Sequence, residues 1–161
     1  MIERRAAAAA DEPFLRELYA STRPDLAGLG EALAAPLLDM QFRAQQVGWE
    51  SSFPGFEHEL ILVEGRPAGR IWVAWASDEC RIVDFALLPE FRRRGIARQV
   101  IGELVDEADR RGVPVRATVE RVNGPSLAMQ LALGFEVVGE DAVNFALERP
   151  VSEACRTPSS A

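Results

Sequence analysis

The stretch 81–98 constrains the fold of this chain more than any other, because it changes from strand to helix through a basic turn. Residues 81–88 form a β-branched and apolar run of strand length, and Pro89 closes it because proline cannot donate to a strand ladder. A helix is predicted from Gly95 on, since apolar residues then recur every four positions. Its apolar face consists of Ile96, Val100, Leu104 and Ala108.

The turn before that helix has the composition of a phosphate-binding loop. The start of a helix leaves several backbone N–H groups unpaired, and its dipole favours an anion there. Positive charge is concentrated at the same place, on Arg92, Arg93, Arg94 and Arg98. The pattern indicates a cradle for a phosphate. An ordinary strand-to-helix turn with a solvated arginine face is the alternative interpretation.

A second element lies downstream, at 123–135, where Asn123 precedes a short helix that ends in Leu133-Gly134-Phe135. With both elements in view, the chain resembles the GNAT superfamily of N-acetyltransferases. The acetyl-coenzyme A loop of that family matches Arg92 to Ala97, and its later asparagine, helix and Leu-Gly-Phe segment matches 123–135. The resemblance covers residues 1 to about 148, with its specific motifs between Asp84 and Phe135.

Composition limits the possible partners. The net charge is −7 and every one of the 18 basic residues is arginine, which argues against general nucleic-acid binding. No apolar run approaches the roughly 20 residues that cross a bilayer, and Asp11 and Glu12 interrupt the alanine-rich start, so neither a membrane span nor a signal peptide is predicted. Cys80 and Cys155 have no metal-binding spacing and fit thiols in a cytoplasmic protein. We therefore expect no metal, no nucleic-acid partner and no membrane partner.

The length of 161 residues suits one domain, which we place at 1–149, followed by a flexible tail at 150–161. Strands are expected near 2–5, 59–63, 68–75, 81–88, 113–121, 135–138 and 142–147, and helices near 11–23, 31–47, 95–111 and 125–133. Residues 25–30 and 49–57 are expected to be loops. The order strand, helix, strand across 81–121 predicts a parallel pair. The expected class is α/β (α+β), with a mixed, mostly antiparallel sheet of six to seven strands and helices on both faces. The resemblance adds that the central parallel pair splays apart.

The resemblance implies acetyl-coenzyme A as co-substrate and assigns its binding residues. Backbone N–H groups between Arg93 and Ala97 would hold the pyrophosphate, while the arginines neutralise phosphate charge. The pantetheine arm would pair with the strand backbone as an added strand does, and Asn123 would contact the cofactor. The predicted cofactor set is Ala86, Leu87, Leu88, Arg92, Arg93, Arg94, Gly95, Ile96, Ala97, Arg98 and Asn123. A turn residue before Gly124-Pro125 is the alternative interpretation of Asn123.

The reaction implied is direct attack of an amine on the thioester, which requires a general base. Asp84 is the first candidate because it is a lone carboxylate in an apolar strand, and Glu120 is the second. His58, the single histidine, is a weaker candidate. A structural carboxylate paired with an arginine is the alternative for Asp84. The family often carries a tyrosine as general acid seven residues after the asparagine, and here Gln130 occupies that position.

The leading interpretation is an N-acetyltransferase that acts on a primary amine of a small molecule, a peptide or a protein. A non-catalytic acyl-coenzyme A-binding module is the alternative, which Gln130 supports. A nucleotide-binding protein is disfavoured because the glycine-rich nucleotide motifs are missing. Trp49, Phe53 and Phe56 either shape the acceptor pocket, as the equivalent segment commonly does in this family, or anchor the helices to the sheet. The acceptor, the use of longer acyl groups and a possible homodimer stay open.

Overall fold

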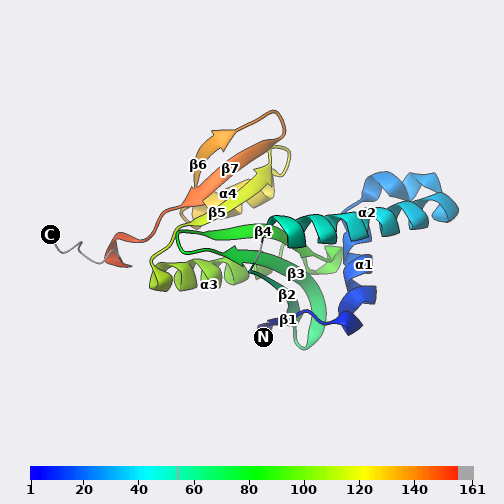
Figure 1. Ribbon diagram of the computed structural model, residues 1–161, viewed down its shortest axis with the longest axis horizontal. Coiled ribbons are helices and arrows are strands. Elements are labelled where there is room, and N and C mark those ends of the chain that lie inside the picture. The colour runs from blue at the N-terminus through cyan, green and yellow to red at the C-terminus, as the bar shows by residue number, and fades with distance from the viewer. Residues whose placement is uncertain (54, 156–161) are drawn as a thin grey trace. The chain divides into compact units, whose positions relative to one another are not determined.

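The computed structural model describes residues 1–53 and 55–155 (Figure 1). The order of strands and α-helices is β1 (Ile2–Ala6), α1 (Glu12–Ser21), α2 (Glu31–Ser52), β2 (Phe56–Val63), β3 (Arg66–Trp75), β4 (Cys80–Leu87), α3 (Ile96–Arg111), β5 (Val115–Glu120), α4 (Gly124–Ala132), β6 (Glu136–Glu140) and β7 (Asn144–Arg149). Short 3-10 helices are η1 (Ala9–Asp11), η2 (Pro24–Leu29), η3 (Pro89–Phe91) and η4 (Glu153–Cys155). Of the predicted tail, residues 156–161 lie outside the described residues.

Within the described residues, seven strands form one mixed sheet in the order β1-β2-β3-β4-β5-β7-β6. β1 is antiparallel to β2, and β7 is antiparallel to both β5 and β6. β4 and β5 are parallel, with Cys80 opposite Val115 and Ile82 opposite Ala117. The predicted class, a mixed and mostly antiparallel sheet with one parallel pair, is confirmed.

The chain forms two compact units, which are described separately. The first consists of Met1–Val73 and Asp84–Arg94. Its apolar core joins the N-terminal helices to β2, because Leu15, Tyr19, Phe42 and Leu60 are all buried in one cluster. The only tyrosine of the chain is thus a core residue, and its hydroxyl accepts a 3.3 Å hydrogen bond from Arg23.

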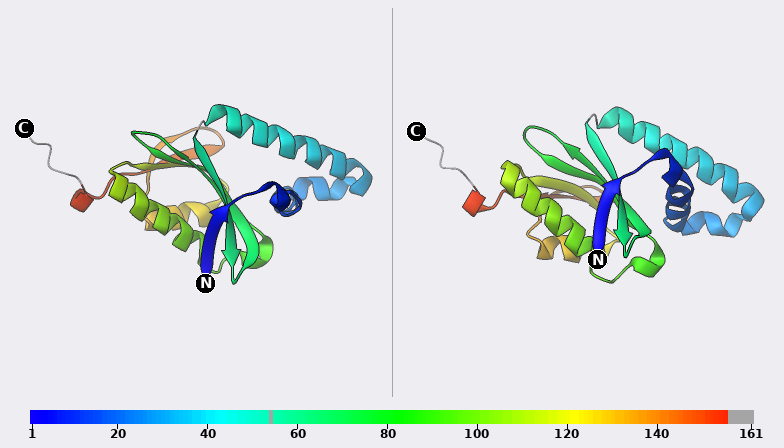
Figure 2. Two further views of the ribbon diagram at one scale, coloured as in Figure 1. Left: turned by 60° about the horizontal axis from the view of Figure 1, so that its bottom comes forward. Right: turned by 90° about the horizontal axis from the view of Figure 1, so that it is seen from below.

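Two expectations about the N-terminal helices were wrong. Residues predicted as a loop form η2, which lies beside α2 in both views of Figure 2. α2 does not end near Val47 but continues to Ser52. The extra turn is stabilised by tertiary contact, since the ring of Trp49 lies 5.0 Å from that of Trp72 on β3.

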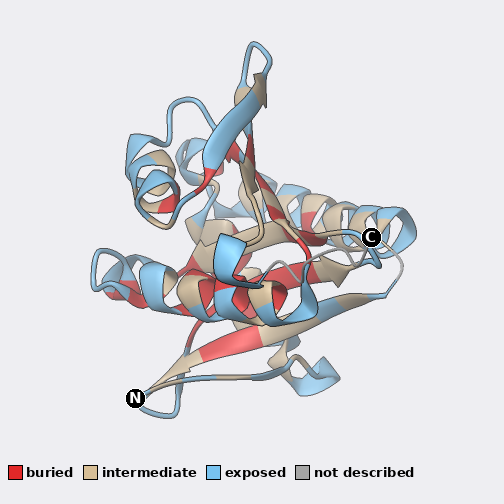
Figure 3. Ribbon diagram, turned by 90° about the vertical axis from the view of Figure 1, so that its left-hand side faces the viewer, coloured by how far each residue is buried: buried red, intermediate tan, exposed pale blue. Residues whose placement is uncertain are grey.

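The second unit consists of Ala74–Val83 and the chain from Gly95 on. Its longest helix, α3, begins and ends at left-handed glycines, Gly95 and Gly112, as the sequence predicted to within a residue. The buried residues of α3 follow its helical period, and Figure 3 shows how buried and exposed residues alternate along the elements. They are Ile96, Val100, Ile101, Leu104, Val105 and Ala108.

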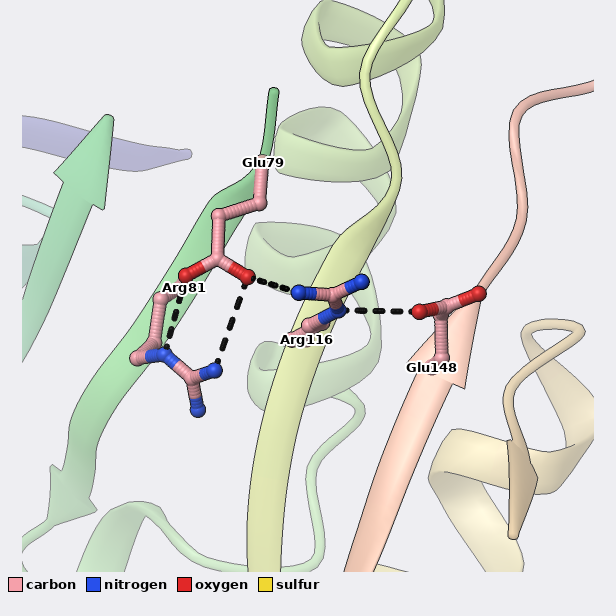
Figure 4. Close-up of polar contacts among 4 residues, drawn as sticks. All are labelled: Glu79, Arg81, Arg116 and Glu148. Atoms are coloured by element: carbon pink, nitrogen blue, oxygen red, sulfur yellow. Dashed lines mark hydrogen bonds and ion pairs between the residues drawn. The ribbon is translucent and has the colours of Figure 1, made fainter. Parts of the chain in front are cut away.

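Ion pairs connect the strands of the second unit (Figure 4). Glu79 accepts hydrogen bonds from both Arg81 and Arg116, and Arg116 also donates to Glu148. Arg116 thus links Glu79 to Glu148. Burial disfavours the charged form of Glu79, but hydrogen bonds and charge from the two arginines favour it, so the pKa of Glu79 is lowered overall. This network joins the start of β4 to β5 and β7.

Candidate active site

The segment 89–97 has the local geometry of an anion site. After η3, Arg93 and Gly95 both adopt left-handed backbone conformations, with φ of 59° and 77°. Gly95 is required for this conformation and not for space, because an added Cβ would meet nothing within 4 Å. No side chain caps the first turn of α3, so its N–H groups stay available to a ligand.

The arginines of this segment are exposed, and their charge is largely uncompensated. Within residues 1–53 and 55–155, no carboxylate pairs with Arg93, Arg94 or Arg98. The guanidinium of Arg94 lies 5.7 Å from the centre of the Phe91 ring. Arg92 differs, because its Nε donates a 2.9 Å hydrogen bond to the carbonyl oxygen of Leu87. The chemistry of this donor set fits a pyrophosphate.

The end of β4 is already partly hydrogen bonded. The N–H of Leu88 donates to the carbonyl oxygen of Ala68 at 2.8 Å, and the carbonyl oxygen of Leu87 is bound by Arg92. The carbonyl oxygen of Ala86 passes over Gly69, only 2.2 Å from where a Cβ at that position would be. A pantetheine arm would therefore have to pair with the remaining backbone groups of 86–88.

Asp84 lies on β4 in the first unit and pairs with an arginine that sequence reasoning did not name. Arg70 on β3 donates from Nε to Oδ2 of Asp84 at 2.9 Å. The side chain of Arg70 is 3% exposed, whereas that of Asp84 is 25% exposed. Gln45 of α2 accepts a second hydrogen bond from Arg70, and the guanidinium lies 5.1 Å from the ring of Trp49. The signal for this pair was present in the sequence, since Arg70 interrupts the apolar run 68–75.

Aromatic rings pack around Trp72, which lies two residues after Arg70 on β3. Trp72 is stacked on Phe56 with ring centres 4.6 Å apart, and the ring centre of His58 lies 4.4 Å from that of Trp72. Burial and the charge of Arg70 lower the pKa of His58 to about 4, although Asp11 opposes this shift. His58 is therefore neutral at pH 7. Trp49 and Phe56 belong to this cluster, so the expected aromatic loop is in part the end of α2 and the start of β2.

In the second unit, Glu120 and Asn123 lie one turn apart at the end of β5. Glu120 is exposed, and its carbonyl oxygen accepts a hydrogen bond from the N–H of Asn123 at 2.9 Å. The side-chain oxygen of Asn123 accepts from the N–H of Ser126, so Asn123 is the N-cap of α4. Its amide nitrogen is thus the group that is left for a cofactor contact.

Gln130 of α4 is buried, and its Nε2 donates to Oγ of Ser126 at 3.2 Å. Within the described residues, its Oε1 has no hydrogen-bond partner. Across residues 1–53 and 55–155, the structure contains no cluster of three or more metal-ligating residues and no helix long and apolar enough to cross a membrane.

Comparison with known proteins identifies the family of this chain. Residues 14–135 match the acetyltransferase (GNAT) family. The chain belongs to that family. Over 100 residues it is 36% identical to the ribosomal protein bS18 alanine N-acetyltransferase of Salmonella typhimurium, a match that covers 58% of this chain and 68% of the relative. It is accordingly a GNAT N-acetyltransferase, an acyltransferase that uses acetyl-coenzyme A.

Solved structures share the fold. The PaiA N-acetyltransferase of Thermoplasma acidophilum, in complex with coenzyme A, superposes with a TM-score of 0.71 at 19% identity, over 93% of this chain and 99% of that one. A ribosomal-protein alanine N-acetyltransferase from Escherichia coli gives the same TM-score at 15% identity, over 100% of this chain and 99% of that one. The coenzyme A belongs to the Thermoplasma structure, and these two likenesses show that the fold is shared.

Proposed function

We propose that this GNAT enzyme acetylates the α-amine at the N-terminus of a polypeptide. The observation that carries the proposal is the pair of Arg70 and Asp84, in which the carboxylate of Asp84 is the candidate base. An α-amine with a pKa near 7.7 costs about 1 kcal/mol to deprotonate at pH 7, whereas a lysine-type amine costs about 4.6. The weaker requirement suits a site whose candidate base is one carboxylate that is already paired with an arginine. The 36% identical relative, named as an alanine N-acetyltransferase, supports the same acceptor class.

In the proposed mechanism, bound acetyl-coenzyme A supplies an activated thioester. Asp84 accepts a proton from the amine, directly or through a water, as the nitrogen attacks the thioester carbonyl carbon. Collapse of that adduct breaks the C–S bond and releases the thiolate, whose pKa near 8.5 demands little help from an acid. Glu120 is the second candidate for the base. Apart from Gln130, no observation favours the non-catalytic alternative.

The cofactor would be held by Ala86–Leu88, Arg92–Arg98 and Asn123. The uncapped first turn of α3 and the unpaired guanidinium groups support this assignment. Acetyl-coenzyme A at 100 times its dissociation constant should stabilise the fold by about 2.7 kcal/mol. A melting temperature that does not rise at millimolar cofactor would contradict the phosphate site.

The acceptor class is tested with two peptides of the same length. One has a free N-terminus and no lysine, and the other has a blocked N-terminus and a single lysine. Mass spectrometry after incubation with acetyl-coenzyme A should find the acetyl group on the α-amine of the first peptide. Transfer to the second peptide alone would refute the proposal.

Further expectations belong to the same proposal. We expect a single domain at 1–149, a cytoplasmic location and no metal, membrane or nucleic-acid partner. Light scattering will distinguish a monomer from a homodimer. Parallel assays with acetyl- and longer acyl-coenzyme A will define the donor range.

A further inference from the structure

Three buried polar atoms around Trp72 have no hydrogen-bond partner within the described residues. They are Nη1 of Arg70, Nε1 of Trp72 and Nε2 of His58. Arg70 and Trp72 are 2% and 1% exposed and lie two residues apart on β3, so their side chains share one face of the strand. Buried donors are nearly always paired in native proteins, so each of these two orphaned donors indicates a missing acceptor.

The orphaned Nη1 cannot easily turn to another partner. Asp84 fixes Nε of Arg70, Gln45 fixes Nη2, and the guanidinium plane lies against Trp49. The C-terminal half of α2 provides Gln45 and Trp49, and both residues contact Arg70 of β3 in this unit. Nη1 is therefore held in a defined direction, and so is the indole N–H of Trp72, which is packed against Phe56 and Trp49.

The charge of the cluster defines the kind of acceptor. Arg70 and Asp84 cancel each other, and His58 is neutral at pH 7. A second carboxylate or a phosphate would bring an uncompensated negative charge into a buried place. An uncharged oxygen accepts from the same donors without that cost, and a carbonyl oxygen has two lone pairs for them.

We infer that Nη1 of Arg70 and Nε1 of Trp72 bind the carbonyl oxygen of the first residue of the acceptor polypeptide. This rests on the proposed function, in which Asp84 takes the proton from the α-amine. The amine nitrogen and the carbonyl oxygen of one residue are only three covalent bonds apart, and Asp84 and Arg70 are in direct contact at 2.9 Å. One ion pair thus serves both groups of an N-terminal residue. The acceptor class is an α-amino carbonyl compound, and an alkyl amine lacks half of the recognised structure.

Selectivity between two small acceptors tests this inference. Alanine amide carries the amine and the carbonyl, and isopropylamine has a methyl group in place of the carboxamide. The values of kcat/KM are compared per neutral amine, because the pKa values of the two amines differ. Trp72→Phe keeps a ring but removes the N–H, and should lower the preference for alanine amide about tenfold, the effect of one lost hydrogen bond.

Trp75→Phe is the matched control, since Trp75 is on the same strand but lies against Arg111, 3.9 Å from its ring centre. It should leave the preference unchanged. Arg70→Lys is the second variant, because lysine keeps a positive charge beside Asp84 but removes Nη1. An unchanged preference in both Trp72→Phe and Arg70→Lys, with transfer to alanine amide intact, would overturn the inference and leave the proposed function standing.

A second readout needs no variant to fold. The three indole N–H signals of the ¹⁵N-labelled protein are recorded with coenzyme A and an increasing concentration of alanine amide. The signal of Trp72 should move downfield as it gains an acceptor, while that of Trp75 stays in place. If alanine amide saturates the enzyme without moving the Trp72 signal, the donors bind an ordered water only and the inference is wrong. If the wild-type protein transfers no acetyl group to any α-amine, the inference and the proposed function both fail.

Discussion

Arg70 on β3 and Asp84 on β4 form a hydrogen-bonded ion pair, with Nε of the arginine 2.9 Å from Oδ2 of the carboxylate. The arginine is buried, so its charge depends on Asp84 for compensation. A structural role and a catalytic role of Asp84 are therefore not exclusive. Experiments on this carboxylate have to measure stability and turnover separately.

Asp84→Asn should lower turnover by roughly 100-fold or more near neutral pH, because the base is removed while the shape is kept. The loss should shrink at high pH, where the amine deprotonates without help. Arg70 loses its counter-ion, so the free energy of unfolding should also fall, by about 1–3 kcal/mol given the partial exposure of Asp84. A pH profile of kcat at a temperature well below melting separates the two effects. Glu120→Gln is the matched control, and a larger loss in that variant would move the base to Glu120.

Gly95→Asp should weaken binding of acetyl-coenzyme A about tenfold or more, because a negative charge would face the phosphates. Gly95→Asn is the control for the added side chain, because asparagine tolerates the left-handed backbone and carries no charge. This variant should bind acetyl-coenzyme A more tightly than the aspartate variant. Calorimetry measures both affinities. Gly102→Ala within α3 is a further control, where an added Cβ meets nothing within 4 Å and affinity should not change. Equal affinities of the Asp and Asn variants would place the phosphates elsewhere.

Gly69→Ala should destabilise the fold by about 1–3 kcal/mol or prevent folding, because the new Cβ would overlap the backbone oxygen of Ala86. Backbone cannot move aside as a flexible side chain does. Gly48→Ala in α2 is the contrasting change, since its Cβ meets nothing within 4 Å and alanine favours a helix by about 1 kcal/mol. Thermal melting of the two variants should shift in opposite directions. A Gly69→Ala protein as stable as wild type would show that β4 does not need this close approach.

His58 should make the fold less stable in mild acid. Its pKa is about 4 in the folded protein, mainly through burial, and about 6.5 in the unfolded chain. As the pH falls from 6.5 toward 4, the unfolded chain binds a proton that the folded protein does not, so the free energy of unfolding decreases. Allowing for partial exposure of the ring, we expect about 1 kcal/mol at pH 5, or about 2–4 °C in melting temperature. The difference between wild type and His58→Gln isolates this effect from the titrating carboxylates, and parallel curves for the two proteins would contradict it.

The parts of the structure that were predictable from sequence depend on neighbours along the chain. The basic turn, the start of α3 and its stop at Gly112 were predicted because a proline, a glycine and a four-residue apolar period lie in one contiguous stretch. The same holds for the parallel strands on either side of that helix. Local pattern was less informative for α2, since Gly48 and the aromatic residues after it resemble a loop, whereas tertiary contact between Trp49 and Trp72 extends the helix.

The candidate site shows the same division. The segment 92–98 could be proposed as a phosphate site because its residues are consecutive, and family resemblance added Asn123 as a candidate. Asp84 could be chosen as a lone carboxylate, but its partner could not be named, because the contact with Arg70 depends on how β3 and β4 are aligned. The orphaned N–H of Trp72 was beyond prediction for a similar reason. Whether a donor finds an acceptor is decided by packing in three dimensions and not by residue type.

The close approach of Trp49 and Trp72 has a practical consequence for spectroscopy. Two indole rings 5.0 Å apart and tilted by 60° are near enough for their electronic transitions to couple. The folded protein should therefore show an exciton couplet in its circular dichroism spectrum that Trp49→Phe or Trp72→Phe abolishes and Trp75→Phe leaves intact. Trp49 belongs to α2 and Trp72 to β3. The intensity of that couplet therefore measures, without a label or a cofactor, whether α2 is packed against β3.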